Sequence, residues 1–323
     1  MKTILVLAMN GMMDSGVAIT LDTLRAGQQF QPRNAKRNSV RIMTAAHTQT
    51  VTLAGGMQLR VDVTLAQLAR EDWTPDWVIV PGLGLTSDQM IAQRFAKKDA
   101  IAAIAMLQAL PPTTRVGASC SGVFLLAQSG LLHGRHVTMT WWLASVFRTR
   151  HPDVKLDETR MLVTDGPFLT AGSAFAQLDL TLAIVADVMG AVTAETCSRY
   201  LLIDQRPSQA RYMIPSHKQY ADPTVVAAER WIDMRLAEPI NVGELASALA
   251  VSTKTLARRL DATLGLSPVK FIQQRRMLHA AHLIESTSMS IEAVAEKVGY
   301  QDATALRKLI KRGFGMTPTA LRR

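Results

Sequence analysis

The sequence predicts a doubly wound α/β domain followed by an all-α domain with two helix-turn-helix motifs. In the first 200 residues, apolar runs of strand length alternate with longer helical patterns. In the last hundred residues, one pattern of apolar, small and basic residues occurs twice. A chain of 323 residues is also long enough to form two separate cores. These observations together predict two domains of different architecture.

The N-terminal domain, residues 1–204, is predicted from hydrophobic periodicity. Its strand-length apolar runs are Thr3–Leu7, Val40–Met43, Trp77–Val80 and Val116–Ala118, and its helical patterns are Leu21–Ala26, Asp88–Leu110 and Ser121–Leu131. Apolar strands that alternate with helices are typical of a parallel sheet covered on both faces. Ligands of such sheets bind beyond the carboxyl ends of the strands, so we expect a binding crevice there.

The C-terminal domain, residues 223–323, contains an internal repeat. At an offset of 50 residues, the matched positions are Leu256, Arg258, Leu260, Gly265, Ser267 and Pro268 with Leu306, Lys308, Ile310, Gly315, Thr317 and Pro318. Upstream, at an offset of 49, they are Leu245, Ala246 and Leu249 with Val294, Ala295 and Val298. Two copies fit a duplicated module better than a solenoid.

Each copy predicts a helix, a tight turn and a second helix, over about 242–261 and 291–312. Ser252 and Asp302 are the expected N-caps of the second helices. Gly299 is expected to form the second turn, because a residue without Cβ closes a helix at positive φ. Between the copies, about 268–285 is predicted to form one linker helix with Pro268 in its first turn. Its length of roughly 27 Å is of the order of the ~34 Å that separates successive major-groove faces.

The outward residues of the second helices are predicted to contact DNA. They are Thr253, Lys254, Thr255, Arg258, Arg259, Thr304, Arg307, Lys308, Lys311 and Arg312. A plain helical hairpin is the commoner explanation of two short helices. However, 13 Lys/Arg against 6 Asp/Glu from position 241 onward place +7 of the net charge of +10 in this region. Such side chains can contact phosphates and base edges without burying an unpaired charge.

From about Asp222 to Arg323 the chain resembles the AraC/XylS-type DNA-binding domain. The resemblance rests on many positions in register, including Val251-Ser252, Ser267-Pro268, Val298-Gly299-Tyr300 and Thr317-Pro318. Leu260, Leu306 and Ile310 stand where this family usually has phenylalanine. Because these replacements are apolar, they leave the expected fold unchanged.

In the N-terminal domain, Cys120 lies in a predicted strand-to-helix turn. Small residues flank it in Gly117–Gly122, as a sharp nucleophile elbow requires, and a helix N-terminus there would favour the thiolate. A buried cysteine with a structural role is the alternative and, for an isolated cysteine, the commoner case. Pro81–Gly84 is a weaker indication of a ligand-binding loop after the preceding strand.

Residues 1 to about 200 resemble the PfpI-like branch of the class I glutamine amidotransferase superfamily, and the domain order resembles that of the GlxA-type regulators. The supporting stretches are Asp14-Ser15-Gly16, Val80-Pro81-Gly82, Ser119–Gly122 and Thr170–Gly172. The resemblance implies a flavodoxin-like fold, with a ligand pocket at Asp14, Gly82, Cys120, Ser121 and Thr140.

The same resemblance implies that this pocket is not catalytic. Enzymatic relatives pair the elbow cysteine with a histidine, and Thr140 stands at that position. Threonine cannot accept a proton near neutral pH, so no Cys–His pair forms there. His133 and His136 are expected on the exposed side of a turn. We therefore predict no catalytic residue, no metal and no cofactor.

The expected function is sequence-specific transcription regulation controlled by a small metabolite. The resemblance to the GlxA-type regulators implies that this metabolite contains nitrogen and that the protein is an activator. Expected partners are a double-stranded DNA operator, this effector, RNA polymerase and a second copy of the chain. The first alternative is a PfpI-like cysteine hydrolase or glyoxalase-type enzyme with a DNA-binding tail. The second is a nucleoid-type binder without sequence preference.

Three further expectations concern the context of the chain. Residues 205–222, part of a stretch with several prolines, are predicted to be a linker. Two widely spaced cysteines, Cys120 and Cys197, fit a reducing compartment and so the cytoplasm. No apolar stretch reaches 18 residues, so we predict no membrane span, and the apolar start of the chain is interpreted as a first strand.

Overall fold

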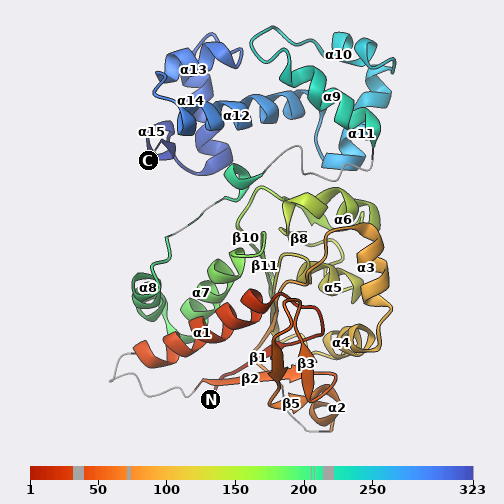
Figure 1. The fold of residues 1–323 in the computed structure, drawn as a ribbon, viewed down its shortest axis with the longest axis vertical. Helices are drawn as coiled ribbons and strands as arrows, with labels where there is room; N and C mark the ends of the chain where they lie inside the picture. The colour runs from red at the N-terminus through yellow and green to blue at the C-terminus, as the bar shows by residue number, and fades with distance from the viewer. Residues whose placement is uncertain (32–39, 71–73, 205, 207, 214–221, 323) are drawn as a thin grey trace. The chain divides into compact units, whose positions relative to one another are not determined.

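The computed structural model describes residues 1–31, 40–70, 74–204, 206, 208–213 and 222–322. The chain forms two compact units (Figure 1). The first contains Met1–Leu143 and His151–Arg206, and the second contains Ala144–Arg150 and Pro207–Arg323. Most of the predicted linker, residues 205–222, lies outside the described residues.

The first unit is built on a seven-stranded sheet in the order β10-β11-β7-β6-β1-β2-β5. The strands are β1 (Thr3–Leu7), β2 (Arg41–Ala46), β5 (Val63–Thr64), β6 (Trp77–Val80), β7 (Arg115–Ser119), β10 (Leu162–Asp165) and β11 (Phe168–Ala171). All neighbouring pairs are parallel except the edge pair β10–β11. Every residue of β1 and β6 is buried, as expected for strands covered on both faces.

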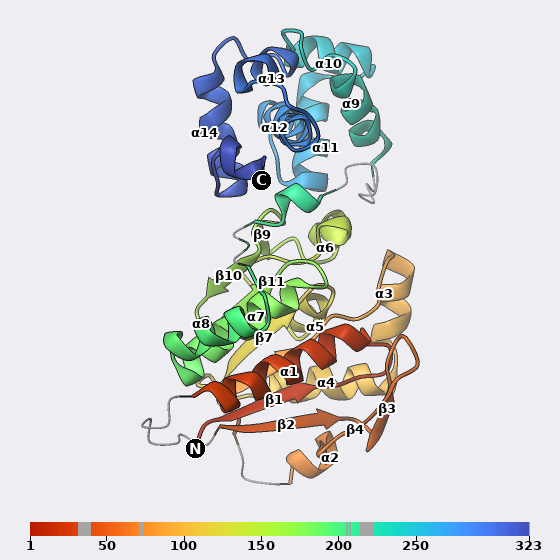
Figure 2. The same ribbon diagram turned by 60° about the vertical axis from the view of Figure 1, so that its left-hand side comes forward.

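Helices cover both faces of this sheet (Figures 1 and 2). On one side, α1 (Asp14–Phe30), α7 (Ala176–Met189) and α8 (Ala191–Tyr200) contact one another. On the other side lie α4 (Lys98–Gln108) and α5 (Gly122–Gln128), and α4 contacts the short α2 (Leu65–Leu68) and α3 (Asp88–Phe95). The predicted doubly wound α/β fold is therefore confirmed. Smaller elements are β3 (Thr50–Thr52), β4 (Gln58–Arg60), β8 (His136–Val137), η1 (Trp141–Leu143) and β9 (Lys155–Leu156).

The prediction of a single helix over Asp88–Leu110 was wrong, because this segment forms two helices, α3 and α4. Lys97 between them is extended. At this break the Arg94 guanidinium binds the Asp99 carboxylate at 2.6 Å, and both side chains are nearly buried. Arg94 also donates to the Asn10 carbonyl. These tertiary contacts stabilise the break between the two helices, and the helical periodicity of the sequence does not reveal them.

The second unit contains the helical domain, together with α6 (Ala144–Arg150) and η2 (Ala210–Tyr212). Its helices are α9 (Pro223–Asp233), α10 (Val242–Ala248), α11 (Thr253–Leu264), α12 (Pro268–Ser286), α13 (Ile291–Lys297), α14 (Ala303–Phe314) and α15 (Pro318–Leu321). The first motif shares a buried core with α9 and the start of α12, which includes Leu245, Leu256, Leu260 and Phe271. The predicted helical domain with helix-turn-helix motifs is thus confirmed, and α12 lies between the two motifs in the chain.

The turn inside each motif contains a left-handed residue at the matched position. Ala250 has φ 53° and Gly299 has φ 78°. Gly299 also lacks room for a side chain, because a Cβ there would lie 2.4 Å from the Leu236 carbonyl oxygen. The two turns therefore share a left-handed residue, although the second turn is one residue longer, and only the second uses the residue type that this conformation favours.

Candidate DNA-binding surface and effector crevice

The first predicted reading helix, α11, begins at its expected cap. The Ser252 hydroxyl accepts the Thr255 backbone N–H at 3.0 Å, which satisfies one of the free donors of the first turn. Leu256 and Leu260 are buried on the inner side of the helix. As a result, the opposite side of the helix faces solvent.

The predicted contact residues of α11 differ in their exposure and in their contacts within the protein. Thr253, Lys254 and Arg258 are exposed, and Thr255 is half-buried. The Arg259 guanidinium instead hydrogen-bonds the Thr224 hydroxyl and lies 3.6 Å from the Asp222 carboxylate. Arg259 therefore ties α11 to the start of α9, a role that helical spacing did not indicate.

The second predicted reading helix, α14, has the same organisation. The Asp302 carboxylate accepts the Thr304 backbone N–H at 2.7 Å, and the buried side of the helix includes Leu306, Ile310 and Phe314. Its predicted contact residues are all exposed, namely Thr304, Arg307, Lys308, Lys311 and Arg312. This surface is more basic than that of α11.

The linker helix α12 anchors elements of both halves of the domain. Near its middle, the buried Arg275 forms ion pairs with Glu229 and Asp233 of α9. The adjacent Arg276 donates to the Gly299 carbonyl in the turn of the second motif, at 3.2 Å, and to the Glu238 carbonyl after α9. Arg275 and Arg276 are structural residues whose roles were not evident from the sequence, because their partners are distant along the chain.

In the first unit, Cys120 forms the predicted elbow between β7 and α5. Its φ is 52°, which is strained for a residue with a side chain. Glycines make the turn possible on both sides. A Cβ on Gly82 would lie 2.9 Å from the Cys120 Cβ, and one on Gly122 would lie 2.7 Å from the Val80 and Pro81 carbonyl oxygens.

The surroundings of Cys120 do not activate the thiol. Its side chain is buried, and burial raises the pKa of the thiol, which the backbone N–H of Ser121 and the Thr140 hydroxyl only partly offset. The Thr140 hydroxyl is buried and, apart from this interaction, has no hydrogen-bond partner among the described residues. His133 and His136 are exposed, so neither is placed to act as a buried base at the elbow.

The structure brings four of the five predicted pocket residues together and uses the fifth differently. Gly82 and Thr140 lie at Cys120, and the neighbouring Ser121 donates its hydroxyl proton to the Leu83 carbonyl. Asp14, at the start of α1, accepts the backbone N–H groups of Gly55 at 2.5 Å and Met57 at 3.2 Å. Asp14 therefore holds the turn between β3 and β4.

A buried polar network behind the elbow was not predicted. The Ser119 hydroxyl binds the Gln177 side-chain oxygen, and the Gln177 amide donates to the Thr20 hydroxyl at 2.6 Å. Thr20 in turn donates to the Gly16 carbonyl at 2.7 Å. This chain of hydrogen bonds joins β7, α7 and α1. It was not predicted because its polar residues are far apart in the sequence and are not part of the hydrophobic periodicity.

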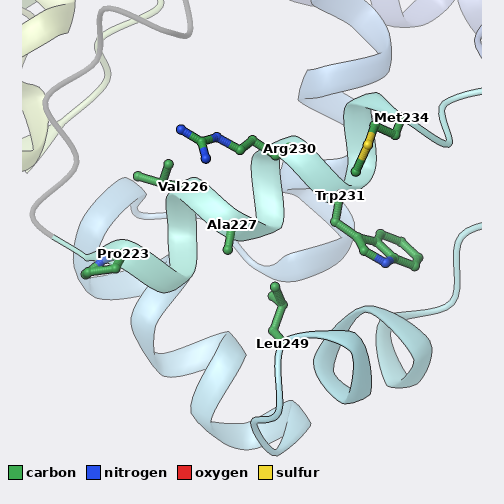
Figure 3. Close-up of a pocket in the computed structure, with 7 residues that line it drawn as sticks. All are labelled: Pro223, Val226, Ala227, Arg230, Trp231, Met234 and Leu249. Atoms are coloured by element: carbon green, nitrogen blue, oxygen red, sulfur yellow. The ribbon is translucent and has the colours of Figure 1, made fainter.

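A shallow apolar cavity of about 610 Å³ lies on α9, apart from the predicted DNA contacts. Figure 3 shows the Leu249 side chain directed toward Ala227, with Trp231 beside them and Arg230 projecting from another side of α9. No described helix is long and apolar enough to cross a membrane. Within the described part of the chain, no group of three or more His, Cys, Asp or Glu residues could hold a metal ion.

An α/β domain with a cysteine elbow, followed by paired helix-turn-helix motifs, defines a class of protein that joins a PfpI-like domain to an AraC-type DNA-binding domain. Comparison with known families agrees. Residues 2–187 match the DJ-1/PfpI family, and residues 245–323 match a helix-turn-helix domain. The chain therefore belongs to the DJ-1/PfpI family.

Individual relatives are named as transcriptional regulators. The HTH-type transcriptional regulator GlxA of Rhizobium meliloti is 28% identical over 217 residues, 65% of each chain. The HTH-type transcriptional regulator GbdR of Pseudomonas aeruginosa is 27% identical over 207 residues, 63% of this chain and 56% of GbdR. The match thus spans less than two thirds of either relative. A THiJ/PfpI family protein from Pseudomonas syringae has the same fold, with a TM-score of 0.52 and 20% identity over 67% of this chain and 82% of its own.

Proposed function

We propose that this protein is a sequence-specific DNA-binding transcription regulator whose activity is controlled by a small metabolite. The observation that carries the proposal is the pair of capped helices, α11 and α14, which expose basic side chains opposite a buried apolar side. Such helices can enter major grooves. The relatives named as transcriptional regulators support the same function.

The N-terminal domain is proposed to bind the effector without transforming it. The expected effector is a small nitrogen-containing metabolite, and the proposed site is formed by Gly82, Cys120, Ser121 and Thr140, with Asp14 at its edge because the preceding residue, Met13, donates its backbone N–H to the Gly82 carbonyl. The enzyme alternative requires a base that activates the cysteine thiol. Thr140 cannot act as that base, and burial disfavours the thiolate. These features favour binding over hydrolysis.

The proposed mode of action is activation in the cytoplasm by a homodimer that binds an operator and RNA polymerase. An effector can shift such a protein only if it binds two conformational states with different affinity. In a dimer, each chain would contribute two DNA-contacting helices, α11 and α14. The dimer would then contact several major grooves, which increases affinity over one motif alone.

Selection from randomised DNA duplexes by the full-length protein tests the central part of this proposal. Repeated cycles should enrich one sequence, because base-edge contacts in the major groove distinguish all four base pairs. Recovery of unrelated sequences in every cycle would contradict sequence-specific binding and favour the nucleoid-type alternative.

A thermal-shift screen of the full-length protein against amino acids and small amines tests the effector. A ligand present at 100 times its Kd should stabilise the unit that binds it by about 2.7 kcal/mol. The Thr140→Val variant should lose the shift if the ligand binds at Cys120, since valine keeps the shape but removes the hydroxyl. An unchanged shift in this variant would place the effector elsewhere.

A further inference from the structure

We propose that Glu292 is a positioning residue that holds Arg307 for recognition of a guanine in the major groove. This inference rests on the proposed DNA binding and specifies part of its mechanism. It begins from an ion pair between the two helices of the second motif. The Arg307 Nη2 atom on α14 lies 2.6 Å from the Glu292 Oε1 atom on α13.

The pair is exposed on a mostly basic surface, to which Glu292, in the first turn of α13, and Asp302, the cap of α14, add carboxylates. About half of the Arg307 side chain and two thirds of the Glu292 side chain are accessible. An exposed pair contributes little to folding stability, so stability alone does not explain it. The first turn of α13 favours an acidic residue, but a carboxylate among the proposed phosphate contacts also opposes binding of a polyanion. The pairing of Glu292 with Arg307 is therefore the observation that points to a role in selectivity.

The geometry leaves most of the guanidinium available for DNA. A guanidinium has five N–H donors in a planar arrangement, and Glu292 is the one hydrogen-bond partner of Arg307 among the described residues. Two of the remaining donors are enough for a bidentate contact to guanine O6 and N7, the commonest specific contact of arginine. Fixing the side chain before binding reduces the conformational entropy lost on contact.

The same pair disfavours nonspecific contacts. The Glu292 carboxylate is ionised at neutral pH, and its own backbone N–H and Arg307 hold the pKa of this group below its ordinary value. The negative charge of Glu292 offsets the positive charge of Arg307 and repels a nearby phosphate. A phosphate contact by Arg307 is therefore weakened, whereas a contact to a neutral base edge is not.

Glu296 provides a matched control on the same short helix. It is also exposed on α13, and none of the described arginines or lysines forms a salt bridge with it. Glu292→Gln and Glu296→Gln remove the same charge from the same surface and keep the side-chain size. Only Glu292→Gln removes the charge that pairs with Arg307, and the glutamine oxygen can then accept only a weaker, neutral hydrogen bond from Arg307.

The test is duplex selection followed by binding titrations, with full-length wild type, both glutamine variants and Arg307→Ala. The DNA sequence selected by the wild-type protein should contain a G·C pair whose replacement weakens binding about tenfold. Arg307→Ala should abolish this preference and Glu292→Gln should reduce it, whereas Glu296→Gln should keep it. On mismatched DNA, Glu292→Gln should also steepen the salt dependence by about one phosphate contact, because the released arginine becomes free to bind the backbone.

Two results would overturn the inference while leaving the proposed function intact. One is a base preference that is identical in wild type and Glu292→Gln, and the other is an equal change in both glutamine variants. A wild-type protein that enriches no sequence would instead contradict the proposed function itself.

Discussion

At position 140 a threonine hydroxyl, in place of an imidazole, interacts with the thiol of Cys120. The elbow geometry of the family is thus present without a base to activate the nucleophile. This combination was predictable in part. The small residues around Cys120 indicated the elbow, but the degree of burial and the use of Asp14 to hold the β3–β4 turn depend on segments about 40 residues apart.

The protonation of Cys120 gives a prediction at this scale. Because burial raises the pKa of the thiol, the thiolate is scarce at neutral pH, and the rate of alkylation by iodoacetamide should still be rising with pH at the ordinary thiol pKa of about 8.5. The measurement uses a Cys197→Ser background, since Cys197 is the second cysteine. A rate that reaches its plateau below pH 7 would show an activated thiolate and revive the enzyme alternative.

The two turn residues give a second residue-scale prediction. Ala250→Gly should stabilise the helical domain by about 0.5–1 kcal/mol, because the left-handed conformation is strained for alanine, and the added freedom of the unfolded chain only partly offsets this gain. Gly299→Ala should destabilise it by about 2 kcal/mol or more, since it combines the same strain with a clash against the Leu236 carbonyl. Urea unfolding of the full-length protein measures both. Equal effects of the two substitutions would contradict the described turn geometry.

At the scale of elements, the sequence predicted what depends on local pattern. The bounds of β1 and β6 agreed residue for residue, and both N-caps, Ser252 and Asp302, accept the expected backbone N–H groups. The break between α3 and α4 was missed because it depends on the Arg94–Asp99 contact. The antiparallel edge strand β10 was also missed, since it is half-buried and lacks an apolar run.

Reading by α11 and α14 gives a prediction for matched positions of the repeat. Arg258→Ala and Lys308→Ala should each weaken binding to the selected sequence, because both side chains are exposed on the predicted reading surface. A base contact should cost about 1–3 kcal/mol of discrimination, and a phosphate contact should lower the salt dependence by about one. Titrations at two salt concentrations distinguish these cases. Unchanged binding by both variants would mean that another side of the helices contacts DNA.

At the scale of the whole molecule, each domain supplies one half of the proposed regulator. The internal repeat was visible in the sequence because both copies need the same apolar positions, caps and turns. The effector was not predictable, since its contacts depend on how loops meet at the carboxyl edge of the sheet. The proposed activator role, dimer and RNA polymerase contact rest only on the resemblance to regulators that join a PfpI-like domain to an AraC-type DNA-binding domain.

The most direct test of the central claim is hydroxyl-radical footprinting of the full-length protein on its selected sequence. Because each chain has two DNA-contacting helices, each bound chain should protect two segments whose centres lie about 10–10.5 base pairs apart on one face of the duplex, and a bound dimer should protect two such pairs. Lys308→Ala should weaken protection of one segment of each pair more than the other. A single protected segment, or uniform protection without a preferred site, would contradict the account.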